Sequence, residues 1–468
     1  TSSQVSVLTT SQLNALTNIN KIEPADLAVI SATSLNKLTS AQLANLSTAQ
    51  ANALTASQIK ALSTVQISQS EAADIGALNT AAIVSLTTAQ LVALTTAQAA
   101  ALTTNQVSKL TTAQVAAIET ADLVKMTTAQ IVALTTDHAS ALTTSQINNL
   151  TTAQIAVIET ADLVKLTTDQ IVALSSAQIP SFTTDQLVKL TTAQIKAIET
   201  LDLQQLTTAQ LVSLTSVQVP VLTTAQVVAL TTAQAAALTT NQVSKLTTTQ
   251  VAAIETADLV KMTTAQIAGL SSVQISALTT DQVIKLTTDQ IQAIQTLDFQ
   301  QMTTGQIAAL TDTQVPVVTT AQIVALTTAQ AAALTPNEVS KLTTAQVAAI
   351  ETADLVKMTT AQIVALSSDQ ITALTTNQVA NLATNQVKAI ETLDLQKMTS
   401  AQIAAFTNTQ VPALTTAQIA AIETADLSSL AFKSRPSLEV LSVSESYLFC
   451  NAAISASSCA ISLRRLSS

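Results

Sequence analysis

The chain has 468 residues, a net charge of −10, 48 % hydrophobic residues and only 1 % aromatic residues. The negative charge argues against a nucleic-acid partner and a basic membrane-surface helix, because both need clustered Lys and Arg. No uninterrupted apolar stretch of about 20 residues occurs, so we expect no membrane insertion. With so few aromatic residues, a core has to be built from Leu, Ile, Val and Ala.

Residues 1–21 are predicted to form an N-terminal cap. Leu8 and Leu16 each open an octad, but Leu16 and Ile22 are only six residues apart. Such a phase slip is typical of an atypical terminal repeat. The chain begins at Thr1 rather than Met, which predicts a mature product or a fragment.

Residues 22–429 divide into 51 octads without an insertion. With Ile22 as position 1, position 1 is a large apolar residue in all but one octad, and position 6 is always apolar. Position 5 is usually Gln and otherwise mostly Asp, as in LTTAQVAA from Leu110 and IETADLVK from Ile118. Every acidic residue before residue 430 lies at positions 2 to 5, and all but one of the lysines lie at position 7 or 8.

This arrangement predicts one very short helix in each octad. Acidic residues favour a helix N-terminus and lysines its C-terminus. Thr at position 2 and Gln at position 5 form a capping box, and positions 1 and 6 supply the hydrophobic staple. Pro24 and Pro336 lie at position 3, the first helical position, where the missing N–H costs nothing. The predicted fold is an all-α solenoid whose core is made by positions 1 and 6.

A β-solenoid with two octads per coil is the alternative. It requires a period of two, but positions 1 and 6 have opposite parity. Only three glycines are present for tight corners. The alternative is favoured by four prolines at position 7, where a longer helix would be damaged: Pro180, Pro220, Pro316 and Pro412. A helix that ends at position 7 tolerates them.

A longer period is superimposed on the octads. Residues 222–317 match residues 318–413 almost octad for octad, which defines a 96-residue super-repeat. Octads of the IETAD type recur within it, and several are 40 residues apart. Copying of whole blocks is typical of a solenoid whose length can be tuned. The IETAD-type octads begin at Ile118, Ile158, Ile198, Ile254, Ile294, Ile350, Ile390 and Ile422.

Residues 430–468 form a Ser-rich tail without octads. The tail holds every Arg, the only Tyr and both cysteines, Cys450 and Cys459. It is predicted to be either a terminal cap or an out-of-frame segment. The absence of Cys from the preceding residues is typical of an exported protein, so the expected location is extracellular or at the cell surface.

No catalytic, cofactor-binding or metal-binding residue is predicted, and the chain is not expected to be an enzyme. His138 is the only histidine and replaces Gln at position 5, so we interpret it as a tolerated substitution in a capping position. The Glu–Asp pairs of the IETAD octads could bind Ca²⁺, but both residues also suit a helix N-terminus. These pairs include Glu119/Asp122, Glu255/Asp258 and Glu351/Asp354.

Two resemblances are visible in the motifs. The segment LTPNEVSKL from Leu334 is similar to the opening of TAL-effector repeats, but the 34-residue period and the second helix are missing. The LTTAQxxAL octads over residues 8–429 resemble long bacterial surface and adhesin-like proteins. That resemblance implies a passive structural role.

The sequence therefore predicts a non-catalytic structural protein, such as a self-assembling filament, surface-layer or stalk subunit. A solenoid scaffold that binds a peptide or protein is the alternative. Position 7 is most often Val or Ala, as at Val92, Ala116, Val124, Val132 and Val364, although it should face outward. An apolar stripe along the solenoid would then be covered either by another copy or by successive solenoid turns.

Overall fold

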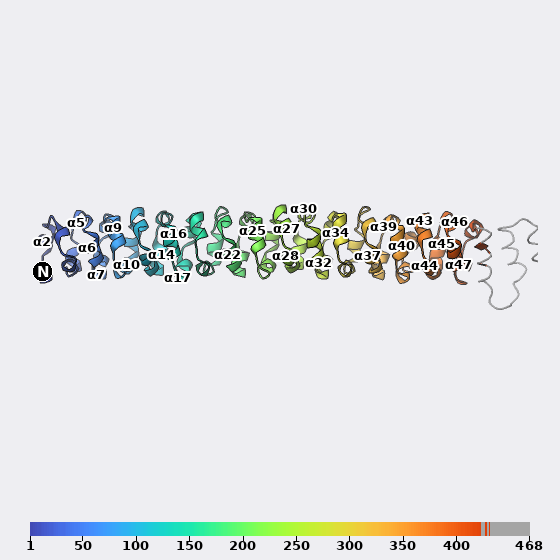
Figure 1. The fold of residues 1–468 in the computed structure, drawn as a ribbon, viewed down its shortest axis with the longest axis horizontal. Helices are drawn as coiled ribbons and strands as arrows, with labels where there is room; N and C mark the ends of the chain where they lie inside the picture. Colours follow the sequence, from blue (N-terminus) through green and yellow to red (C-terminus); the bar gives the residue numbers. More distant parts are fainter. Residues whose placement is uncertain (423–425, 428–429, 431–468) are drawn as a thin grey trace, which may run out of the picture. The chain divides into compact units, whose positions relative to one another are not determined.

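The computed structural model describes residues 1–422, 426–427 and 430. By compactness the chain divides into two units, Thr1–Gln234 and the residues from Ala235 onward. In the described part each unit is a solenoid of short helices with no strand (Figure 1). The all-α prediction is confirmed, and the β-solenoid alternative is wrong for these residues. The tail residues 431–468, with both cysteines, lie outside the described residues.

Each α-helix from α3 (Pro24–Ala28) to α48 (Thr416–Ala421) begins at position 3 of its octad and is four to six residues long. The six-residue helices end at position 8 and the five-residue helices at position 7. The N-terminal segment holds α1 (Ser2–Val5), α2 (Thr10–Asn14) and a 3₁₀ helix, η1 (Ile19–Lys21), at the phase slip. The four-residue helices from α3 onward are α4 (Ala32–Leu35), α15 (Thr120–Leu123), α20 (Thr160–Leu163), α24 (Thr200–Leu203), α30 (Thr256–Leu259), α35 (Thr296–Phe299), α36 (Thr304–Ile307) and α41 (Thr352–Leu355).

The predicted capping box forms in the typical octad. In α14 (Thr112–Ala117) the Gln114 backbone N–H donates to Thr111 Oγ1 at 3.2 Å, and the Thr111 N–H donates to Gln114 Oε1 at 2.8 Å. Pro24 and Pro336 occupy the first helical positions of α3 and α39 (Pro336–Lys341). Such short helices are unstable alone, so each depends on its caps and on packing.

The core is formed by positions 1 and 6, as predicted. In the α14 octad Leu110 and Val115 are buried, and the same two positions are buried in nearly every octad. The core is therefore continuous within each unit and aliphatic, with three buried phenylalanines, Phe182, Phe299 and Phe406.

Helices that pack together are three octads apart in the sequence, not adjacent. α14 packs on α17 (Thr136–Ala141), and α7 (Ala56–Ala61) packs on α10 (Thr80–Ser85). Figure 1 shows both pairs side by side. Gln114 reaches the carbonyl groups of Ile83 and Leu86, 31 and 28 residues earlier. A turn of the solenoid is therefore completed in three to four octads.

Prolines at position 7 change the local helix type. Their octads contain no α-helix but a 3₁₀ turn, because proline has no N–H to donate to the position-3 carbonyl. In the Pro220 octad the box between Thr215 and Gln218 is kept, at 2.9 and 3.3 Å, and Val219 stays buried. The octad thus tolerates proline by changing the helix and keeping the core. The 3₁₀ helices of these four proline octads are η2 (Ile179–Ser181), η3 (Val219–Val221), η4 (Val315–Val317) and η5 (Val411–Ala413).

The position-7 side chains face outward, as predicted, but they do not form one straight apolar stripe along the solenoid. Val92, Val132 and Val364 are exposed, whereas Ala116 and Val124 are half-buried. Consecutive octads are separated by about a third to a quarter of a solenoid turn, because three to four octads complete one turn. Position-7 side chains of consecutive octads therefore point to different sides of each unit, which corrects the prediction of a single stripe.

Candidate functional site

The buried position-5 side chain is the most regular polar feature of the structure. In the octad of α19 (Thr152–Ala156), Gln154 Oε1 accepts the Thr151 N–H at 2.9 Å. Its Nε2 donates to the carbonyls of Leu123 at 2.8 Å and Met126 at 2.9 Å. One amide thus closes the capping box and joins its octad to those three and four octads earlier. The bonds that the Gln amide donates to earlier octads were not predicted from the sequence.

His138 occupies the same position as the position-5 glutamines. Its Nδ1 accepts the Thr135 N–H at 3.2 Å, and its Nε2 lies 2.7 Å from the Leu110 carbonyl, to which it donates. Because both partners are backbone groups of fixed role, the neutral tautomer with a proton on Nε2 fits. The interpretation of His138 as a substitution in a capping position is confirmed by this geometry. The side chain is buried.

Most aspartates at position 5 are buried like the glutamines, although Asp298 is half-buried, and they bond differently. Ser272 Oγ donates to Asp298 Oδ1 at 2.6 Å, and Ser368 Oγ to Asp394 Oδ1 at 2.6 Å, each across three octads. Burial raises the pKa of Asp122. A hydrogen bond from the Thr96 hydroxyl partly offsets this rise, and the nearby charge of Glu119 adds to it. A carboxylate cannot donate to backbone carbonyls as Gln does.

Two position-5 aspartates have a larger shift. Burial first, and the neighbouring Glu71 second, raise the pKa of Asp74 to about 6. Burial and then Glu159 raise the pKa of Asp162 to about 6. The placement of these acids at a helix N-terminus was predicted, but for Asp74 and Asp162 the cost of burial exceeds any benefit from the helix dipole. This corrects the interpretation that all the acidic residues are favourably placed.

Glu338 is the one glutamate at position 5. Its Oε2 accepts the Thr335 N–H at 2.5 Å, while Oε1 is buried without a partner. Burial raises its pKa, and bonds from Thr335 partly offset the rise. The capping box therefore works with a carboxylate, but the bonds to other octads do not form.

The Glu–Asp pairs lie on single helical turns without forming a larger cluster. Glu119 is the N-cap of α15 and makes no side-chain cap bond, and Asp122 is buried at the third helical position. Among residues 1–422 and the three described beyond them, no group of three or more His, Cys, Asp or Glu could hold a metal ion. None of the described helices is long and apolar enough to cross a membrane.

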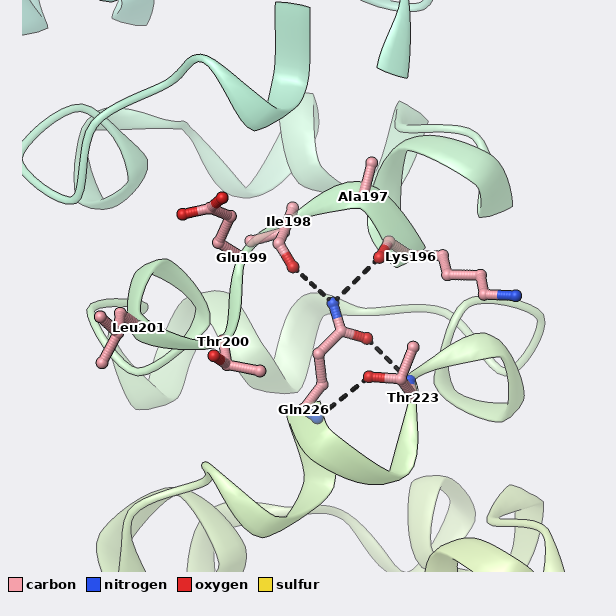
Figure 2. A pocket seen from close by; sticks show the side chains of 8 residues that line it. All are labelled: Lys196, Ala197, Ile198, Glu199, Thr200, Leu201, Thr223 and Gln226. Atoms are coloured by element: carbon pink, nitrogen blue, oxygen red, sulfur yellow. Dashed lines mark hydrogen bonds between the residues drawn. The ribbon is translucent and has the colours of Figure 1, made fainter. Parts of the chain in front are cut away.

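An open depression of ≈ 450 Å³ lies beside α24 in the first unit. It is lined by residues 196–201 together with Thr223 and Gln226. In Figure 2 the Lys196 and Glu199 side chains extend to opposite sides of the depression. Gln226 Nε2 donates to the Ile198 carbonyl at 2.7 Å and the Lys196 carbonyl at 3.5 Å, which fixes the floor (Figure 2).

The same floor hydrogen bond, which most position-5 glutamines make, is present 96 and 192 residues later. In the second copy Gln322 Nε2 donates to the Ile294 carbonyl at 2.8 Å, and in the third Gln418 Nε2 donates to the Ile390 carbonyl at 2.7 Å. At position 4 the three copies carry Leu201, Leu297 and Leu393, which are 69 %, 75 % and 68 % exposed. These exposed leucines were not predicted from the sequence, although the replacement of IETAD by ETLD or QTLD distinguishes their octads.

Comparison with known families agrees with the repeat architecture. A family model described as the ALTTAQ repeat matches most of the chain. The chain belongs to the ALTTAQ repeat family. No curated protein and no solved structure matches it. The matched residues are 19–56, 71–104, 115–152, 155–192, 195–232, 221–248, 251–288, 291–328, 347–384 and 387–424.

Proposed function

We propose that this ALTTAQ repeat protein is a non-catalytic structural protein that assembles with further copies of itself outside the cell. The proposal is carried by the exposed aliphatic side chains that recur along the described repeats, because soluble monomers rarely expose large apolar areas. The position-4 group includes Val65, Val217 and Val273, each more than half exposed. The position-7 group is Val84, Val92, Val132, Val172, Val188, Val228, Ile284, Val324 and Val364.

The composition of the surface favours self-assembly over a scaffold for an unrelated partner. Binding hot spots are enriched in Trp, Tyr and Arg. Here Trp is absent, and Arg and Tyr occur only after residue 430. The phenylalanines of the described part, Phe182, Phe299 and Phe406, are buried in the core. Near-identical octads instead offer the same surface many times, which suits a lattice of like chains.

An extracellular location is the second part of the proposal. The chain has no cysteine before Cys450, which suits a protein that matures where stray thiols would oxidise. The long array of interchangeable octads also suits a passive spacer whose length can change by duplication.

Light scattering and negative-stain imaging of the purified chain test the proposal. We expect the scattering mass to rise with concentration and extended assemblies to be visible. We expect the combined substitutions Val132→Lys, Val172→Lys and Val228→Lys to reduce assembly while helicity is retained. The matched control carries Ala133→Lys, Ala173→Lys and Ala229→Lys at the adjacent position 8 and keeps the three valines. A chain that stays monomeric at high concentration contradicts the proposal.

A further inference from the structure

Three octads present a large apolar side chain where related octads have none. Leu201, Leu297 and Leu393 stand at position 4 of the octads that begin at Ile198, Ile294 and Ile390, and all three are strongly exposed. The IETAD octads with an otherwise similar sequence have Ala at position 4: Ala121, Ala161, Ala257 and Ala353. Exposing Leu in place of Ala leaves more apolar surface in water, so the fold alone gives no reason for it.

Polar side chains accompany these leucines. Position 7 of the preceding octad is Lys196, Gln292 or Lys388, and all three are exposed. Before the Ala-containing octads the same position is Ala116, Ala156, Ala252 or Ala348. Among the IETAD-type octads, the leucine and the preceding long polar side chain therefore occur together or not at all.

The charges at the three sites are balanced. In the first copy Lys196 is followed by Glu199, and in the third copy Lys388 is followed by Glu391. In the second copy both charged residues are replaced together, by Gln292 and Gln295. At position 7 and the following position 2, each site therefore carries either a base with an acid or two amides.

Within the described residues, neither Lys196 nor Glu199 is in an ion pair of the same chain. Figure 2 shows why for this site: the two side chains extend from opposite sides of the depression. A surface with a base on one side and an acid on the other is complementary to itself after a two-fold rotation. Such an isologous contact places each charge against its opposite.

We propose that each of these three sites docks on a corresponding site of a second copy of this chain about a local two-fold axis. Lys196 then pairs with Glu199 of the second copy, and Glu199 with its Lys196. Leu201 packs against the opposite depression. At the second site the amides of Gln292 and Gln295 replace the ion pairs, since a primary amide both donates and accepts. The inference rests on the proposed self-assembly and names the contact that produces it.

Each contact is small, so it is weak alone. Stable interfaces bury about 1,200–2,000 Å² in total, far more than one leucine and two ion pairs supply. A chain that carries three such sites can contact more than one other copy, so weak contacts add up over an assembly. Repetition every 96 residues is thus the feature that makes a weak contact useful.

Charge reversal tests the contact on the full chain. We expect Lys196→Glu with Lys388→Glu to weaken self-association by about tenfold in low salt, because attraction becomes repulsion at two sites. Adding Glu199→Lys and Glu391→Lys reverses both partners and is expected to restore association. The matched control is Lys125→Glu with Lys357→Glu, which changes the net charge equally in octads with Ala at position 4. Sedimentation velocity measures all four proteins.

Replacement of Leu201, Leu297 and Leu393 by Ala reproduces the related octads, so the fold is expected to be kept, as circular dichroism would confirm. Association of this variant is expected to fall as well. The two-fold contact is overturned if the Lys196→Glu, Lys388→Glu variant associates as strongly as the Lys125→Glu, Lys357→Glu control. It is also overturned if the variant with both partners reversed does not recover association. In either case the proposed assembly itself still stands. A wild-type chain that never associates overturns both.

Discussion

Gln154 and Asp162 occupy position 5 of adjacent octads, and both are buried. The glutamine accepts one backbone N–H and donates to two carbonyls in other octads. The aspartate makes no such donation when ionised, and its pKa rises to about 6. The octad of Asp162 also has no side-chain cap bond, whereas Glu338 keeps the cap through the Thr335 N–H. The helix cap and the bonds to backbone carbonyls of other octads are therefore separate functions of the position-5 side chain: a carboxylate as long as Glu suffices for the first, but only a donor performs the second.

The largest effect is expected when the glutamine is removed altogether. Gln154→Leu leaves the Thr151 N–H and the carbonyls of Leu123 and Met126 without their buried partner. Each unsatisfied buried group costs about 1–3 kcal/mol, so we expect a loss on the order of 3 kcal/mol in the free energy of unfolding. Urea denaturation measures it. Gln205→Leu at an exposed position is the control and is expected to change stability by less than about 0.5 kcal/mol.

A smaller effect of opposite sign is expected at Glu338. Glu338→Gln removes a buried carboxylate whose Oε1 has no partner and restores the donor found in the neighbouring octads. We expect a gain of about 1–2 kcal/mol at neutral pH. Thermal unfolding is the measurement, with Glu351→Gln at an exposed N-cap as the control. An unchanged or lower melting temperature would show that the donor is not needed there.

The buried aspartates at position 5 make the stability of the protein depend on pH. The pKa of Asp74 and of Asp162 in the folded state is about 6, above the ordinary aspartate value of 3.8. The folded state therefore binds protons more tightly than the unfolded state, and their contribution to stability increases as pH falls from about 7 toward 4. We expect the melting temperature to rise over this range. Asp162→Asn should raise it at pH 8 and have little effect at pH 5.

The smallest effect is expected at His138. In His138→Gln, one side chain that accepts a hydrogen bond from the Thr135 N–H and donates one to the Leu110 carbonyl is replaced by another that can make the same two bonds. We expect a change within about 0.5 kcal/mol by urea denaturation at pH 8. His138→Leu, which keeps the bulk and removes both bonds, serves as the contrast and should be clearly less stable. Equal stability of the two variants would mean that the imidazole bonds contribute nothing.

Much of the local structure could be predicted because it depends on residues within one octad. Thr111 and Gln114 belong to the same capping box, and the opposite parity of positions 1 and 6 favoured helices over strands. The packing of α14 on α17 could not be predicted, since an eight-residue period defines faces but not the number of octads per turn. One signal was available: a capping box accepts Glu as readily as Gln, yet position 5 is Gln far more often than Glu. The Leu201 site was also visible as a departure from the repeat.

The stability of Gln154→Glu at pH 8 tests the central claim most directly. This substitution keeps an acceptor for the Thr151 N–H and removes only the donor to Leu123 and Met126. If the amide joins successive turns, the variant should lose about 2 kcal/mol or more in the free energy of unfolding, and part of the loss should be recovered as pH is lowered and the carboxyl is protonated. Stability equal to that of the wild type at pH 8 would contradict the account, because the side chain would then act as a helix cap alone.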